Sequence, residues 1–209
     1  MRLTAPILAL LLFASPASAA DLSVSVTAPG GKPIRDAVVT VHVASARQDA
    51  RSTLPPPYRM VQKDLQFDPL VLAIPVGADV AFPNLDPVRH HVYSFSAPHP
   101  FELKLYGRDQ TRSVRFDKPG IIAVGCNIHD QMVAFIDVVD TPYAAKTNAA
   151  GEAVIHGVPG GRATLRIWHP YARAPQNRVE RPIVVPADGA AREAAVLDVR
   201  VPVMHHHAY

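Results

Sequence analysis

The sequence predicts an all-β protein made of a mid-sized β-sandwich followed by a smaller one. Short stretches alternate between apolar and polar residues, and Pro/Gly turns separate them at regular intervals. The 209 residues include 21 prolines, about twice the usual share, which excludes a bundle of long helices. Apolar residues make up 48% of the chain and charged residues 19%, so a core can form and wholesale disorder is excluded.

The first alternating segments come soon after residue 20. Apolar residues alternate with polar ones across 22–27 and again across 37–43, on either side of the turn at Pro29-Gly30-Gly31. This pattern predicts a β-hairpin or two adjacent strands within 21–44. A polar, proline-rich loop without periodicity follows over 46–58.

Further short strands are expected before residue 140. They cover 67–74, 79–82, 90–96, 114–116, 121–126 and 132–139. Strands of this length and spacing are typical of a β-sandwich.

The texture of the sequence changes near Thr141, where small residues and turns become frequent. Strands are expected at 152–156 and 162–168, and a last period-2 face runs from Ala195 to Val203. About sixty residues are enough for a small second sandwich of marginal stability.

The N-terminus has the pattern of a secretory signal peptide. Met1-Arg2 precedes an apolar run, and Ala17-Ser18-Ala19 is a small-residue cleavage signal, which predicts cleavage near Ala19 or Ala20. We therefore expect an exported, periplasmic protein. The predicted division is a leader at 1–19, a larger domain at 20–140, a smaller domain at 141–204 and a tail at 205–209.

Charge and hydropathy limit the partners. The net charge of +3 is mild and the sequence has no basic cluster typical of nucleic-acid binding. No other stretch approaches 18 continuous apolar residues, so no stable membrane insertion is expected.

One short segment concentrates side chains that bind soft metal ions. Cys126 is the only cysteine, and it shares a seven-residue loop with His129 and Met132. His90 and His91 come 36 and 35 residues before the cysteine. A thiolate, two imidazoles and a thioether are the ligands of a mononuclear electron-transfer copper site.

Each of these residues also has an ordinary structural explanation. A lone cysteine is often a small buried residue, a histidine is common in loops, and Met132 opens a strand where an apolar residue would lie anyway. Chance rarely places the only cysteine, a histidine and a methionine at these spacings between two strands. The three together therefore favour the copper site. Adjacent residues of a strand face opposite ways, so His90 and His91 cannot both reach one metal; alternation alone leaves open which of them faces inward.

Two stretches carry a resemblance to a known family. Residues 82–95 (FPNLDPVRHHVYSF) and 118–132 (KPGIIAVGCNIHDQM) are similar to cupredoxins, within them to plastocyanin- and amicyanin-like proteins, and closest to the bacterial methylamine utilisation proteins. The resemblance covers about 21–140 and implies a Greek-key sandwich that holds one type 1 copper. It also implies that the copper ligands are His90, Cys126, His129 and Met132.

The resemblance also assigns residues next to the ligands. The family has an Asn after the first ligand histidine, where it ties the two ligand loops together; this chain has His91 there. His91, Asn84 and Asn127 are therefore expected to support the ligands or to act as alternative ligands. A weaker resemblance, mainly in turn positions across 147–161, links residues 141–204 to transthyretin-like and carboxypeptidase-regulatory-like sandwiches.

These features predict a periplasmic one-electron carrier, with a redox protein of unknown identity as its partner and His129 as the exit for the electron. The alternatives are a copper-binding or delivery protein and a structural cupredoxin-like module. Delivery proteins favour open, Met- or His-rich sites, whereas this chain has four methionines including Met1. An enzyme is not expected, because a second copper centre needs further histidines and the sequence has no His-x-His pair outside the tail triplet His205-His206-His207.

Overall fold

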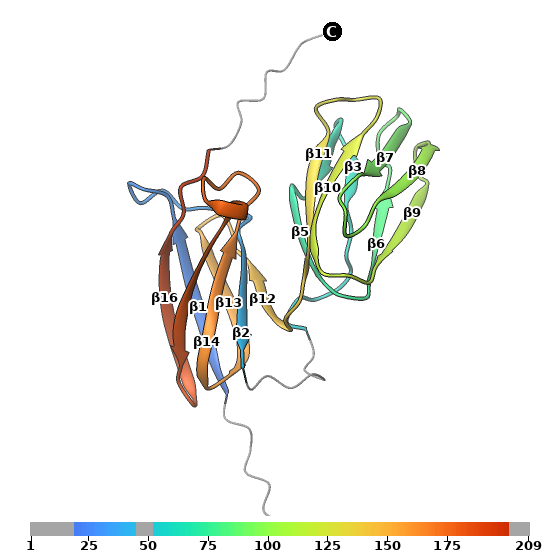
Figure 1. The fold of residues 1–209 in the computed structure, drawn as a ribbon. Coiled ribbons are helices and arrows are strands. Elements are labelled where there is room, and N and C mark those ends of the chain that lie inside the picture. Colours follow the sequence, from blue (N-terminus) through green and yellow to red (C-terminus); the bar gives the residue numbers. More distant parts are fainter. Residues whose placement is uncertain (1–18, 45–51, 201–209) are drawn as a thin grey trace, which may run out of the picture.

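The computed structural model describes residues 19–44 and 52–200. Within them every regular element is a β-strand, apart from the three-residue 3-10 helix η1 (Pro175–Asn177). The strands form two β-sandwiches that lie side by side (Figure 1). The predicted all-β class is confirmed. None of the described residues forms a helix of the length and apolar character that crossing a membrane requires.

The central sandwich comprises residues 52–140. Its main sheet has the order β5-β11-β10-β7-β8, and the strand pairs β6-β9 and β3-β4 complete it. The strands are β3 (Val61–Lys63), β4 (Gln66–Asp68), β5 (Val71–Pro75), β6 (Ala78–Pro83), β7 (His90–Ser94), β8 (Phe101–Tyr106), β9 (Thr111–Phe116), β10 (Gly120–Cys126) and β11 (Val133–Val139).

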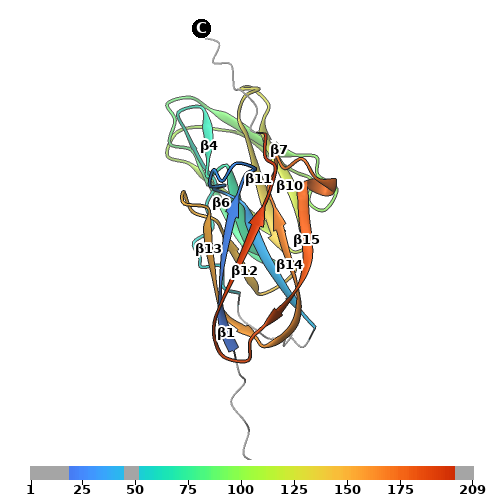
Figure 2. The same cartoon turned by 90° about the vertical axis from the view of Figure 1, so that its left-hand side faces the viewer.

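The terminal sandwich is built from both ends of the described chain, residues 19–44 and 141–200. One sheet has the order β13-β1-β16 and the other β12-β2-β14-β15. In Figure 2 the blue β1 runs next to the dark red β16, so the first and last strands share a sheet. The strands are β1 (Ala19–Thr27), β2 (Val38–Val43), β12 (Tyr143–Lys146), β13 (Glu152–Pro159), β14 (Gly161–Trp168), β15 (Arg178–Val185) and β16 (Gly189–Val196).

This pairing corrects the predicted domain boundaries. Residues 20–44 were expected in the copper domain, but Leu22 pairs with Ile155 in β13 and with Ala191 in β16. The central sandwich is inserted between β2 and β12. The expected hairpin or pair of adjacent strands within 21–44 is also wrong, because β1 and β2 lie in different sheets. Alternation shows which face of a strand is buried, but it does not show which distant strand lies beside it.

The end of the chain departs from the predicted strand in one respect. Leu197 is buried in the terminal core and Val199 packs against it, as the period-2 face predicts. The strand itself ends at Val196, and residues 201–203 lie outside the described part. Residues 1–18 and the tail histidines also lie outside it, so the predicted leader and tail remain predictions.

Period-2 alternation in two neighbouring strands builds the core next to the candidate site. In β10, Ile122, Val124 and Cys126 face the core of the central sandwich, and in β11 Ala134, Ile136 and Val138 do the same. Cys126 is the last residue of β10, where the sheet gives way to loops. The inward face of β10 thus carries the thiol to one end of the central sandwich.

The two sandwiches pack against each other through a third apolar cluster. From the central sandwich it includes Val71, Ala73 and Val139, and from the terminal sandwich Val38 and Trp168. These residues lie on the outer face of each sheet, opposite the sandwich interiors. The cluster covers only part of the facing surfaces, which also contain charged residues.

Candidate metal centre

Strand pairing brings Cys126 to His90. β10 runs antiparallel to β7, with Cys126 opposite Val92. In β7 the residues that face the core are His90, Val92 and Ser94, whereas His91 and Tyr93 face outward and are half-buried. The structure therefore decides what alternation left open, because His90 is fully buried on the thiol's side of the strand.

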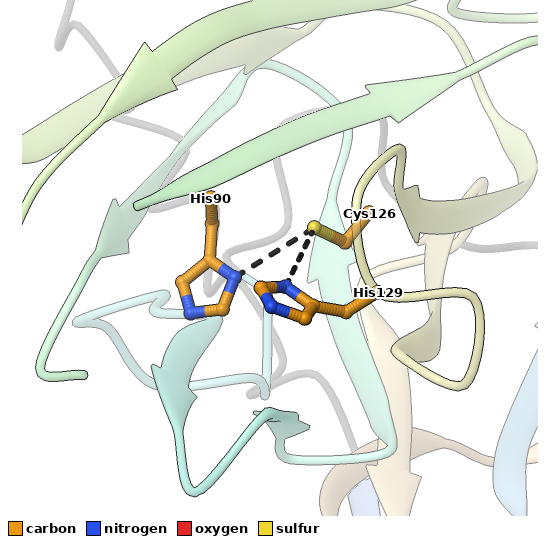
Figure 3. A group of neighbouring side chains, drawn as sticks. All are labelled: His90, Cys126 and His129. Atoms are coloured by element: carbon orange, nitrogen blue, oxygen red, sulfur yellow. Dashed lines mark hydrogen bonds between the residues drawn. The ribbon is translucent and has the colours of Figure 1, made fainter. Parts of the chain in front are cut away.

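Three of the four predicted ligands converge on one point. The Sγ of Cys126 lies 3.6 Å from Nδ1 of His90 and 3.7 Å from Nδ1 of His129. All three ligand atoms lie within 4.8 Å of one another, and both Nδ1 atoms face the sulfur (Figure 3). The described residues contain no other group of three such side chains.

The spacing of these atoms fits a shared metal ion. In zinc sites, metal–sulfur distances of about 2.3 Å and metal–nitrogen distances of about 2.0 Å place the two donors about 3.5–3.7 Å apart for tetrahedral to trigonal angles. The two sulfur–nitrogen separations fall in this range. Thiolate and imidazole together are the donors that copper takes in electron-transfer sites. The donor set therefore fits the metal that the sequence predicts.

Met132 lies close to this group but is not part of the convergence itself. It is buried in the same apolar cluster as Cys126, and its backbone N–H donates to the carbonyl of His129 at 3.0 Å. This bond closes the turn that carries His129 back toward β11. Burial suits both a thioether ligand and an apolar core residue, so the role of Met132 stays a prediction.

A buried carboxylate that the sequence motif does not reveal orients His90. Nε2 of His90 lies 2.7 Å from Oδ2 of Asp86, and both side chains are buried. A carboxylate at this distance accepts a hydrogen bond from Nε2–H, which leaves the lone pair of Nδ1 directed at the thiol. Burial lowers the pKa of His90 and the bond to Asp86 opposes this effect, so the ring stays neutral near pH 7. The only hint of this contact in the sequence is that Asp86 lies four residues before His90.

Backbone groups hold Asp86 in turn. Its carboxylate accepts N–H bonds from Asp64 at 2.6 Å and Leu65 at 3.2 Å, in the turn between β3 and β4. Its own N–H donates to Oδ1 of Asn84, whose amide donates to the carbonyls of Val88 and Tyr106. Asn84 is fully buried and shapes the loop that leads to His90, so it supports the site without facing the thiol.

The two ligand loops are joined through the backbone. The N–H of Asn127 donates to the carbonyl of His91 at 3.0 Å, while the Asn127 side chain is exposed. The imidazole of His91 lies on the outer face, with Nε2 2.8 Å from Glu102. A main-chain hydrogen bond thus joins the two ligand loops, where the resemblance to cupredoxins implied a contact through a side chain. His91 and Asn127 do not join the three converging side chains.

Of the three converging side chains, His129 lies nearest to the surface. Its imidazole is half-buried, whereas His90 and Cys126 are buried, and its neighbour Ile128 is exposed. One edge of the cluster is therefore close to solvent. A ring in this position can connect a buried centre to a partner at the surface.

Comparisons with known proteins found similarity only among solved structures. No known family model matches the chain, and no curated protein matches it. Among solved structures, the chain is similar to the copper-containing nitrite reductase from Thermus scotoductus SA-01, with 29% identity over 46% of this chain and a TM-score of 0.39. That match spans 25% of the reductase chain.

Smaller copper proteins match along their whole length. A purple cupredoxin from Nitrosopumilus maritimus has 21% identity over 40% of this chain and 100% of its own, with a TM-score of 0.37. A Cu(I) structure of an amicyanin variant has 16% identity over 48% of this chain and 98% of its own, also with a TM-score of 0.37. The similarity covers about half of the chain. The methylamine-utilisation subgroup and the kinship of the terminal sandwich stay predictions.

Proposed function

We propose that this protein is an exported type 1 copper protein that carries single electrons between redox partners. The observation that supports this most directly is the convergence of Cys126, His90 and His129 at one end of the central sandwich. A thiolate with two imidazoles is the equatorial ligand set of such sites, and Met132 is placed in the loop where the weak fourth ligand is expected. One copper per chain is proposed, because one such group occurs among the described residues.

Copper bound there would supply a reversible one-electron couple between Cu(II) and Cu(I). The chain's own residues determine how easily that couple works. Cys126 loses its proton to become a ligand. Burial keeps His90 neutral and Asp86 orients its ring. The backbone bond between Asn127 and His91 joins the two loops. Ligands held by these bonds would change little in position between the two oxidation states.

The half-buried ring of His129 supports a transfer role. Electron transfer between proteins needs a short path to the surface rather than a substrate cavity. His129 would provide such a path from the thiol, since its Nδ1 lies 3.7 Å from Sγ and the residue is half-buried. The partner in this proposal is a soluble or membrane-attached redox protein that docks at this end of the central sandwich.

The test is to add one equivalent of Cu(II) to the purified mature chain and record the visible spectrum and a voltammogram. We expect an intense thiolate-to-copper band, one copper per chain and a reversible one-electron wave. A pale product would contradict the type 1 site. An intense band without reversible electron transfer to any surface-confined or protein acceptor would contradict the carrier role and favour copper delivery.

A further inference from the structure

A cavity of about 400 Å³ lies between the two sandwiches, away from the copper ligands. One wall is the outer face of β10 and β11 in the central sandwich, with Ile121, Asp137 and Asp140. The other wall is the sheet of β2, β14 and β15, with Arg166, Trp168 and Arg178. The cavity adjoins the start of β10 and the end of β11, whereas Cys126 ends β10 and Met132 precedes β11. Its volume is in the range of small-molecule sites.

Asp137 is a buried carboxylate without a partner. It lies on the face of β11 opposite the core residues Ile136 and Val138, and it is only 9% exposed. Its side chain makes no hydrogen bond or ion pair with any residue that the structure describes. Burial, with a further contribution from Asp140, raises its pKa to about 7, although Arg166 and Arg178 oppose the shift. Because Asp137 lines the cavity without such a bond to the described residues, its carboxylate is available to a ligand.

The opposite wall carries two arginines. Glu180 contacts both of them, at 2.7 Å from Nε of Arg166 and 2.8 Å from Nε of Arg178. Asp140 approaches Arg166 at 3.8 Å, so Arg166 contacts two carboxylates, whereas Arg178 contacts Glu180 alone among those that the structure describes. Arg178 has five N–H donors and contacts Glu180 through Nε, so donors remain for a ligand. Asp137 and Arg178 thus face one cavity from opposite walls without touching.

We propose that this cavity binds a small zwitterion of the α-amino acid class. The ammonium group would pair with Asp137 and the carboxylate with Arg178, which satisfies both charged walls at once. The side chain would lie against the apolar lining formed by Trp168, Ile121 and Val38. A simple amine would leave the remaining N–H donors of Arg178 unused, and a simple carboxylate would face Asp137. A zwitterion avoids both costs.

The test measures binding to the mature full chain by calorimetry and by the shift in thermal unfolding. The probes are glycine, L-leucine, and two leucine analogues that each lack one charge, 3-methylbutylamine and 4-methylpentanoate. We expect both amino acids to bind, with leucine tighter because of Trp168. Each analogue should bind about tenfold more weakly or worse, since it loses a charged hydrogen bond. Equal binding of an analogue, or no binding of either amino acid at millimolar concentration, would overturn the proposal.

Paired variants locate the site. Asp137→Asn and Arg178→Gln should each weaken leucine binding about tenfold or more. The matched controls are Asp79→Asn and Arg115→Gln, which remove an exposed ion pair of 3.0 Å between β6 and β9 and should leave binding unchanged. Circular dichroism of each variant checks that it is folded, and the analogue series needs no variant at all. Unchanged binding in both cavity variants would place the ligand elsewhere and refute the assignment.

Discussion

Both sandwiches bury polar side chains at the end of a strand, and they use them differently. In the terminal sandwich, the hydroxyl of Thr147 donates to the carbonyl of Ile34 and accepts the N–H of Ala37, so the network closes on the backbone. In the central sandwich, the chain of bonds from Asn84 through Asp86 ends at His90, whose Nδ1 faces a thiol rather than a backbone group. A closed network stabilises a loop, whereas an open one presents a donor atom to something that the chain does not supply. The buried polar groups around Thr147 therefore stabilise a loop, whereas those from Asn84 to His90 orient a side chain of the candidate metal centre.

The largest effect is expected from Cys126→Ser. In the proposed type 1 site the thiolate would carry the intense copper band, so the variant should lose the band completely, while the small change from sulfur to oxygen should leave the core packing nearly intact. Visible absorption with Cu(II) measures the first effect and circular dichroism the second. Persistence of the intense band in this variant would show that Cys126 is not a ligand.

The adjacent histidines provide a matched pair. His90→Ala should abolish the type 1 spectrum because it removes the inward donor, whereas His91→Ala removes an outward ring and its contact with Glu102 and should retain the spectrum. Titration with Cu(II) followed by visible and paramagnetic resonance spectra distinguishes the two. The reverse result would show that His91, and not His90, is the ligand, and that the register of β7 differs by one residue.

A third experiment tests which sandwich contains the N-terminal strand. Leu22→Ala should lower the free energy of unfolding of the terminal sandwich by about 2–5 kcal/mol, since it opens a cavity in that core. Val184→Ala, at a position 73% exposed, is the control and should change stability by less than about 0.5 kcal/mol. Denaturant unfolding followed by circular dichroism is compared with loss of the copper band. If Leu22→Ala weakened the band in parallel with the loss of stability, residues 19–27 would belong with the central sandwich after all.

Asp137 predicts a pH dependence that comes from the interface between the sandwiches. Its pKa is raised from 3.8 to about 7 in the folded chain, so between these values the folded state binds more protons than the unfolded state. Stability therefore falls as pH rises from about 4 to 7, by at most about 4 kcal/mol for this group. Asp137→Asn should remove that part of the dependence in urea unfolding measured across this range. An unchanged pH profile in the variant would mean that Asp137 titrates like an exposed carboxyl group.

The smallest effect concerns Asp86. Asp86→Asn removes a negative charge behind His90 but can keep a hydrogen bond, so the band should remain, the reduction potential should rise and Cu(II) affinity should fall about 10–100-fold. Asp130→Asn is the control, because Asp130 is exposed in the loop beside His129. Voltammetry and competition with a chelator measure the two effects. If the reduction potential and the Cu(II) affinity changed equally in both variants, Asp86 would act only through its negative charge and not through its bond to His90.

Local signals predicted much of the site. The loop from Cys126 to Met132 is short, so its donors had to lie near one another whatever the rest of the chain did, and His129 does meet the thiol. Asp86 was missed because its role depends on a side chain four residues later and on two backbone N–H groups from another turn. His91 and Asn127 were grouped with the site by resemblance, and the structure instead uses their backbone atoms.

The sequence by itself determined the all-β class, the inward faces of strands such as that of Leu22, and the donor types in the Cys126 loop, because period-2 alternation and ligand chemistry are local properties. Tertiary structure decided which strands are neighbours: that β1 lies between β13 and β16, that His90 rather than His91 faces Cys126, and that Asp137 and Arg178 line one cavity. These outcomes depend on pairing between segments far apart in the chain. The free energy of such pairing is a property of the whole core, and no window of sequence contains it.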